Sequence, residues 1–173
     1  MEVEMQFSRS YAAAMRIVAL TVIILLQTGV ANAQESVVGV WKAVSIETKD
    51  VATGQTTQPF GALPNAMFIF TKGGHFANIL TGANRKPPEG RNPTDAERAE
   101  LHRSMSAYSG TFRVEGNKLI MTITTSSMQS WNGMVRTLDL EFQGNRVQGT
   151  SEPFKSAIGS GNIVAVNVWE RVE

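Results

Sequence analysis

The chain has 173 residues, 42% of them hydrophobic, and a formal net charge of +1, with 16 Lys and Arg against 15 Asp and Glu. This near-even balance leaves no basic excess to bind a phosphate backbone, so we expect no nucleic-acid partner. The chain has no cysteine, which excludes disulfides, thiol catalysis and cysteine metal sites.

Residues 1–33 have the organisation of an export signal. Basic residues precede the apolar run Ile17–Leu26, which only Thr21 interrupts. The segment Ala31-Asn32-Ala33 has the small-x-small pattern that signal peptidase accepts, so we expect cleavage after Ala33 and a periplasmic or secreted protein. The alternative is an uncleaved anchor, but the run is shorter than the ~20 residues that span a bilayer. We therefore expect no stable membrane span after cleavage.

The sequence allows more than one translation start for this signal. Glu2 and Glu4 are unusual in a positively charged leader. Translation from Met5 would remove both, and translation from Met15 would still leave a basic residue before the apolar run, so Met1 is one of three candidate starts.

Residues 34–173 form the expected mature chain, whose length suits one domain with its own core. The first strand is predicted over Gly39–Asp50. Val40 and Ile46 lie on one face of this strand, and Trp41 and Ala43 lie on the other. Because both faces carry apolar side chains, alternation alone does not identify the inner face.

A β-hairpin is predicted over Ala66–Leu80. Two runs rich in aromatic and β-branched residues flank Thr71–Gly74, and glycine accepts the positive φ of a tight turn. The segment Pro59–Pro64 before the hairpin is an irregular connection. The segment Thr81–Pro93 after it holds two Gly and three Pro, and is predicted to be an open loop.

One helix is predicted in the mature chain, over Thr94–Met105. Thr94 is a good N-cap, and Glu97 three residues later completes a capping box. Leu101, Met105 and Tyr108 give only one thin apolar stripe. Such a stripe suits a short helix laid over the end of a sheet structure, and cannot organise a helical core.

The rest of the chain has the pattern of short strands and glycine turns. The predicted strands, in two hairpins and a final strand, are Gly110–Glu115, Lys118–Ser127, Val135–Phe142, Arg146–Thr150 and Asn162–Val172.

The closing strand favours a barrel over a sandwich. Consecutive strands are joined mainly by tight hairpins, which gives up-and-down order. Asn162–Val172 is apolar on both faces and should not be an open edge, so we expect it to pair with the first strand. The sequence therefore predicts an all-β fold: an antiparallel up-and-down barrel with one short helix, about residues 94–106, over a barrel end.

Several short motifs then resemble those of one family. They are Gly39-Val40-Trp41, the hairpin Phe68–Phe76, the segment Ala107–Phe112 and the terminal Trp169-Glu170-Arg171. Their order along residues 37–172 is similar to that of the bacterial lipocalin-like domain proteins. The resemblance implies a calycin-like barrel with an internal pocket, but it implies no single activity, because one fold carries many functions.

The resemblance also implies a structural role for both ends of the chain. In lipocalins an arginine near the end of the barrel packs across the tryptophan of the first strand. Arg171 and Trp41 are the corresponding pair here, and Trp169 lies in the closing strand. A guanidinium on an indole face stabilises a protein by about 0.5–2 kcal/mol. The alternative is a solvated Arg171 beside an ordinary core tryptophan.

Five residues are the candidate ligand contacts: His75, Arg85, Tyr108, Met128 and Trp131. His75 follows the hairpin turn and is either a group at the barrel mouth or a half-solvated turn residue, and we favour the second because no partner is evident. Arg85, with Lys86 and Arg91, either meets the anionic end of an amphiphile or simply keeps the loop solvated. The other three either line an apolar pocket, with Met134, or pack as ordinary core.

No motif in the chain indicates a cofactor or metal. The two histidines have no metal-ligand spacing, and no nucleophile elbow, P-loop or dinucleotide fingerprint is present. Three hypotheses stay open at this point. They are a module that binds a small apolar or amphipathic molecule, an isomerase, cyclase or hydrolase working inside the barrel on a similar molecule, and a packed barrel with a structural or interaction role. The ligand and the oligomeric state do not follow from the sequence.

Overall fold

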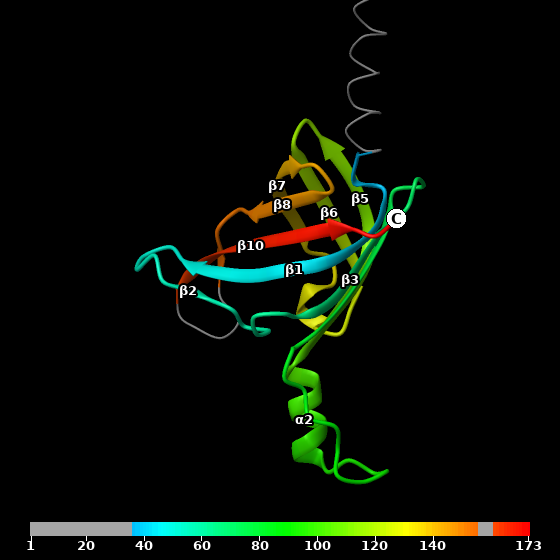
Figure 1. The fold of residues 1–173 in the computed structure, drawn as a ribbon, viewed down its shortest axis with the longest axis vertical. Coiled ribbons are helices and arrows are strands. Elements are labelled where there is room, and N and C mark those ends of the chain that lie inside the picture. The colour runs from blue at the N-terminus through cyan, green and yellow to red at the C-terminus, as the bar shows by residue number, and fades with distance from the viewer. Residues whose placement is uncertain (1–35, 156–160) are drawn as a thin grey trace, which may run out of the picture.

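The computed structural model describes residues 36–155 and 161–173, so the expected signal segment, residues 1–33, lies outside the described residues. Eight long antiparallel strands form a closed barrel (Figure 1). They are β1 (Gly39–Asp50), β3 (Asn65–Phe70), β4 (His75–Thr81), β5 (Met105–Glu115), β6 (Lys118–Ser126), β7 (Val135–Gln143), β8 (Arg146–Ser151) and β10 (Asn162–Arg171). Besides the helix α2 (Asp95–Arg103), three short elements lie between these strands: β2 (Thr56–Thr57), the 3₁₀ turn η1 (Gln129–Trp131) and β9 (Phe154–Lys155).

The barrel closes between its first and last strands. The order along the sheet is β1-β3-β4-β5-β6-β7-β8-β10, and β10 then pairs with β1. This last pairing runs from Trp41 opposite Arg171 to Asp50 opposite Ile163. The predictions of an up-and-down barrel and of its closure by the terminal strands are therefore confirmed.

A β-bulge in β1 explains why its inner face was ambiguous in the sequence. The pairing with β10 shifts register between Ala43 and Ser45, so one extra residue stands in β1 at this point. An extra residue reverses the alternation of the strand beyond it. Trp41 before the bulge and Ile46 after it are consequently both buried, although one is at an odd position and the other at an even position.

The two ends of the barrel differ in their connections. Because successive strands run in opposite directions, the tight turns β3–β4, β5–β6 and β7–β8 all fall at one end. The longer connections, which contain β2, α2, η1 and β9, all fall at the other end. We call the first the closed end and the second the open end. The chain terminus reaches the closed end, where the backbone amide of Val40 donates to the carbonyl of Glu173 at 3.1 Å.

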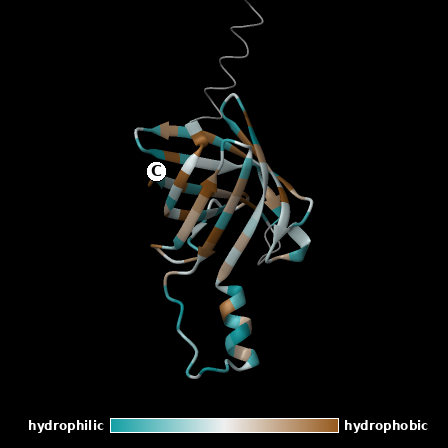
Figure 2. Ribbon diagram, turned by 90° about the vertical axis from the view of Figure 1, so that its right-hand side faces the viewer, coloured by the Kyte–Doolittle hydropathy of each residue, from teal (hydrophilic) through white to brown (hydrophobic). Residues whose placement is uncertain are grey.

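The helix α2 (Asp95–Arg103) lies at the open end and extends away from the barrel with the loop before it (Figure 1). The predicted capping box is present: the amide of Glu97 donates to Thr94 Oγ1, and the carboxylate of Glu97 accepts from the amide of Thr94. None of its residues is buried, and Figure 2 shows hydrophilic colours along the preceding loop and much of the helix. No helix among the described residues is long and apolar enough to cross a membrane.

The start of β5 differs from the prediction. The strand begins at Met105, directly after the helix, rather than at Gly110. It does so because β4 offers a partner along this whole stretch, from Thr81 opposite Met105 to His75 opposite Thr111. The extra strand residues place Ser106 and Tyr108 on the inner face near the open end.

The core fills the closed end with large side chains. Trp41 and Trp169 are each only 1% exposed, and Phe70 is 2% exposed. Phe68 lies 4.6 Å from Trp169 between ring centroids, and Phe70 lies 5.1 Å from Phe112 in an edge-to-face arrangement. These contacts pack aromatic side chains closely inside the barrel toward the closed end.

Arg171 covers the core at the closed end. Its guanidinium carbon lies 4.1 Å from the centroid of Trp41. Its terminal nitrogens donate to the backbone carbonyls of Val38, at 2.6 Å, and of Ser36. The indole nitrogen of Trp41 in turn donates to the carbonyl of Val37 at 2.8 Å. One side chain from the last strand therefore holds both the first strand and the segment before it.

We predict that Arg171→Ala destabilises the protein by about 2 kcal/mol, because it removes a cation–π contact and charge-assisted hydrogen bonds together. For a domain of this size the melting temperature falls by roughly 4–8 °C. Thermal unfolding followed by circular dichroism measures the change. The control is Arg113→Ala, which removes an exposed ion pair with Glu115 and is expected to cost less than about 1 kcal/mol. Equal melting temperatures for both variants would contradict the role of Arg171.

Candidate functional site

A cavity of about 440 Å³ lies inside the barrel at its open end. Its walls are inward-facing side chains of β1, β3, β4, β5, β7 and β10, together with η1, β9 and the connection around β2. This volume falls within the ~300–1,000 Å³ of typical small-molecule sites. The difference between the two barrel ends therefore produces a space that a ligand can fill.

The walls of this cavity are largely apolar. Ile46 from β1, Leu80 from β4 and Ala165 from β10 face it from different sides. The pair formed by Phe68 and Trp169 stands where the cavity meets the packed core. An apolar molecule that enters from the open end would therefore exchange water for hydrocarbon and aromatic surface.

An aromatic cluster stands on one side of the cavity. Tyr108 of β5 and Trp131 of η1 meet edge to face, with centroids 5.7 Å apart. Arg136, the second residue of β7, lies against this cluster. Its guanidinium carbon is 4.5 Å from the centroid of Trp131, 5.1 Å from that of Phe154 and 5.9 Å from that of Tyr108. A cation is thus held on ring faces at the cavity wall.

Two buried polar atoms also lie at the cavity. Asn78 is 3% exposed and Ser106 is 5% exposed, and both line the space. Within the part of the chain that the structure describes, Asn78 Oδ1 and Ser106 Oγ have no hydrogen-bond partner. A buried polar atom without a partner costs about 1–3 kcal/mol, so these atoms are suited to meet a ligand or ordered water.

A smaller recess of about 150 Å³ adjoins the cavity. Tyr108, Arg136 and Phe154 line both spaces. Met121 and Leu138 line the recess but not the cavity. The side chain of Arg136 therefore stands between a larger and a smaller space, both of which have apolar walls.

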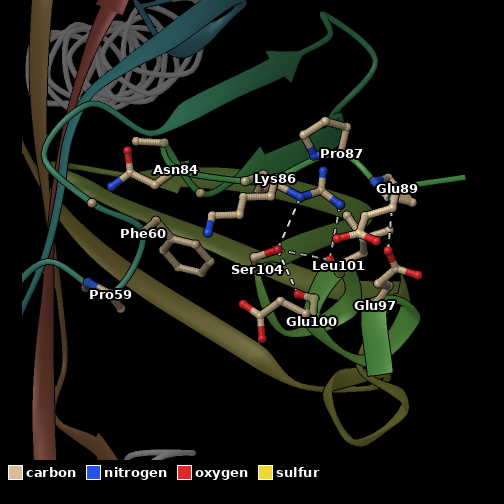
Figure 3. Close-up of a pocket in the computed structure, with 15 residues that line it drawn as sticks. Pro59, Phe60, Asn84, Lys86, Pro87, Glu89, Glu97, Glu100, Leu101 and Ser104 are labelled. Carbon is tan, nitrogen blue, oxygen red and sulfur yellow. Dashed lines mark hydrogen bonds between the residues drawn. The ribbon is translucent and has the colours of Figure 1, made fainter. Parts of the chain in front are cut away.

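A larger cleft, of about 630 Å³, lies outside the barrel between α2 and the loop before it (Figure 3). Arg85 crosses this cleft, donating to Ser104 Oγ and to the carbonyl of Leu101, each at 3.2 Å. The carboxylate of Glu97 accepts from the amide of Glu89 at 3.0 Å. Because exposed loop and helix form its walls, and Arg85 and Glu97 are already hydrogen-bonded to neighbouring hydroxyl and backbone groups, we take the barrel cavity as the candidate site.

The structure brings together some of the residues predicted for the site and separates others. Tyr108 and Trp131 line the cavity. Met128 stands before η1 and does not line it. Arg85 belongs to the outer cleft. His75 is exposed on the outer face at the closed end, opposite the cavity. The three residues predicted to be structural are Trp41, Trp169 and Arg171, which lie together at the closed end.

Sequence reasoning missed Ser106 and three further polar residues of the site, and period-two alternation carries a signal for these three. Arg136 is in phase with the buried Leu138 and Leu140 of β7. Asn78 is in phase with Phe76 and Leu80 of β4, and Asn167 is in phase with Trp169 of β10. A polar residue at an inward position of a barrel strand therefore marks the ligand space.

The comparisons with known proteins agree with this architecture. A family model described as a lipocalin-like domain matches residues 38–172. A search of curated proteins gave no match.

The outer cleft yields a prediction about pH. Hydrogen bonds from the backbone amides of Glu89 and Thr94, and from the Thr94 hydroxyl, lower the pKa of Glu97 from its ordinary value of 4.5. Since the lowered pKa belongs to the folded state, the ionised carboxylate stabilises the cap and loop at higher pH. That contribution is lost as the pH falls through the folded pKa.

The amide resonances of Glu89 and Thr94, followed by NMR, should therefore shift with a midpoint below 4.5. The control is Glu97→Gln, in which this shift should disappear while any effect of the carboxylate of Glu89 itself remains. A midpoint at or above 4.5, or the same titration in Glu97→Gln, would show that the carboxylate does not hold the loop.

Proposed function

The chain belongs to the lipocalin-like domain family, and we propose that it binds a small apolar or amphipathic molecule inside its barrel. The observation that carries this proposal is the cavity of about 440 Å³ at the open end. A barrel with only a structural role gains stability by filling its interior, because an empty space forfeits packing contacts. An apolar space left open at one end instead suits a ligand that comes and goes.

The position of His75 and the apolar walls of the cavity favour binding over catalysis. An enzyme in the barrel needs an acid, base or nucleophile that faces the substrate. Of the two groups considered for this role, Tyr108 lines the cavity, whereas His75 lies on the outer face at the closed end. The walls supply apolar surface and hydrogen-bonding groups, which is what holding a molecule requires.

We also propose that the protein acts after export, in the periplasm or outside the cell. The support for this is the apolar run Ile17–Leu26 followed by Ala31-Asn32-Ala33. A carrier in such a compartment gives an apolar molecule a dry environment in an aqueous space. The lack of cysteine also makes folding of the chain independent of the redox state of that compartment.

The binding proposal is tested with the full chain expressed in a bacterial host and recovered after export. Native mass spectrometry should show a small molecule travelling with the protein. After that molecule is stripped, the neutral apolar dye Nile red should bind with enhanced fluorescence. A persistent apo mass together with no binding of the dye would contradict the proposal.

A matched pair of variants locates the binding in the barrel. Ala165 faces both the cavity and the recess, so Ala165→Trp places a large side chain in the ligand space and should weaken Nile red binding at least about tenfold. Ala77 is exposed on the outer face of β4, so Ala77→Trp should bind the dye as the parent does. Equal binding by the two variants would place the dye outside the barrel.

The export proposal predicts a specific processed form. The recovered protein should begin at Gln34, as intact mass and N-terminal sequencing would show. Ala33→Asp places a charge at the position before the cleaved bond, and the uncleaved precursor should accumulate. Ser36→Asp lies beyond that bond and is the control. Processing of Ala33→Asp at the parental rate and site would overturn the assignment of the cleavage site.

A further inference from the structure

We propose that Arg136 is the recognition group for an anionic head, so that the ligand is a single-chain amphiphile ending in a carboxylate or a related oxyanion. This inference rests on the proposed function, since it requires a ligand in the barrel. It adds the chemical class of that ligand and the residue that selects it.

The first step is the unusual environment of Arg136. Of the arginines in the described ranges, only Arg136 and Arg171 are half-buried, and the others are exposed. Arg171 donates to three backbone carbonyls at the closed end. The side chain of Arg136 makes no hydrogen bond or ion pair with another described residue, and its guanidinium lies over three aromatic rings of the cavity wall.

The second step concerns the free-energy cost of partly burying the Arg136 guanidinium among these rings. Taking a guanidinium partly out of water is unfavourable unless other groups replace its hydration. Aromatic rings recover part of this cost, but they offer no oxygen acceptor to the N–H donors of the guanidinium. The N–H donors point outward in the guanidinium plane, in a fork whose geometry matches the two oxygens of a carboxylate or phosphate. The rings therefore hold the fork in place while its donors stay available.

The third step is that the acids near Arg136 are engaged elsewhere. Asp50 lines the cavity, but its Oδ1 accepts from the amides of Ala52 and Thr53 at 2.9 and 2.7 Å. Glu152 lines the recess, and its carboxylate lies 4.0 Å from Lys118 Nζ. Neither is paired with Arg136, so the positive charge in the cavity is not neutralised by the carboxylates that share its walls.

The fourth step is the rest of the cavity. Ser106 Oγ and Asn78 Oδ1 are buried there without partners in the described chain, and a hydroxyl can donate to a further oxygen of the head group. Ile46, Phe68 and Leu80 offer apolar surface for a chain. A cation, a few hydrogen-bonding groups and a long apolar wall in one space together match an amphiphile with one charged end.

The test compares ligands that differ only in their head group. Decanoate, decyl sulfate, decanol and decylammonium share one chain, and each would compete with Nile red for the stripped protein. We expect at least one of the two anions to bind about tenfold or more tightly than decanol, and decylammonium to bind more weakly than decanol. The order of decanoate and decyl sulfate identifies the preferred oxyanion. Decanol binding as tightly as both anions would overturn the proposal.

Variants assign the preference to Arg136. Arg136→Gln removes the charge, and the ratio of anion to decanol affinity should fall to about one. Arg136→Lys keeps the charge but loses the fork, so it should retain an intermediate ratio, and it serves as the second variant should Arg136→Gln fail to fold. Arg113→Gln lies on the barrel exterior in an exposed ion pair and should keep the parental ratio.

The outcomes separate the two proposals. An unchanged ratio in a folded Arg136→Gln would overturn the role of Arg136 while leaving binding in the barrel intact. If neither Nile red nor any of the four chains binds the parent protein, the proposed function itself fails, and the inference falls with it.

Discussion

The pairing of the first strand with the last is the constraint on which the rest of the structure depends. Nine pairs of facing residues join β1 to β10, from Trp41–Arg171 to Asp50–Ile163. Without this seam both strands would be open edges, each with unpaired backbone donors and acceptors. With it, the sheet encloses an interior, and the inward residues of eight strands share one space. The clamp of Arg171 on Trp41 reinforces the seam where the chain ends meet.

Side chains pack less closely toward the open end of the barrel than at the closed end. This difference leaves a cavity inside the enclosed sheet. Tight turns and large aromatic side chains fill the closed end, while longer connections surround the open end, where the inward residues leave a cavity. The most buried side chains therefore give rigidity at one end, and a ligand could supply the missing contacts at the other. Arg136 lies at the open end, where its guanidinium packs against aromatic rings and lines the cavity that a ligand would enter.

Some of the residues predicted for the site line the cavity, and others lie elsewhere in the structure. Tyr108 and Trp131 were expected in a pocket and line one. Arg136 was missed because an arginine at the start of a strand resembles a solvated residue until the inner face of that strand is known. Ser106 was missed because its segment becomes strand only through pairing with β4. His75 and Arg85 are polar residues next to a turn and in a loop, and their distance from the cavity follows from which barrel end each connection occupies.

The sequence by itself determined the class of fold, its turns and the capped helix of the described chain, because alternation, glycine turns and capping are local properties. It also indicated closure by the terminal strands, because the last strand is apolar on both faces and is unsuited to an open edge. The tertiary structure alone decided three further features. The first is the bulge that places both Trp41 and Ile46 in the barrel interior. The second is which end of the barrel stays open, and the third is the packing of Arg136 against aromatic rings. The physical reason is that each depends on pairing or packing between strands far apart in the chain, and local pattern does not specify those partners.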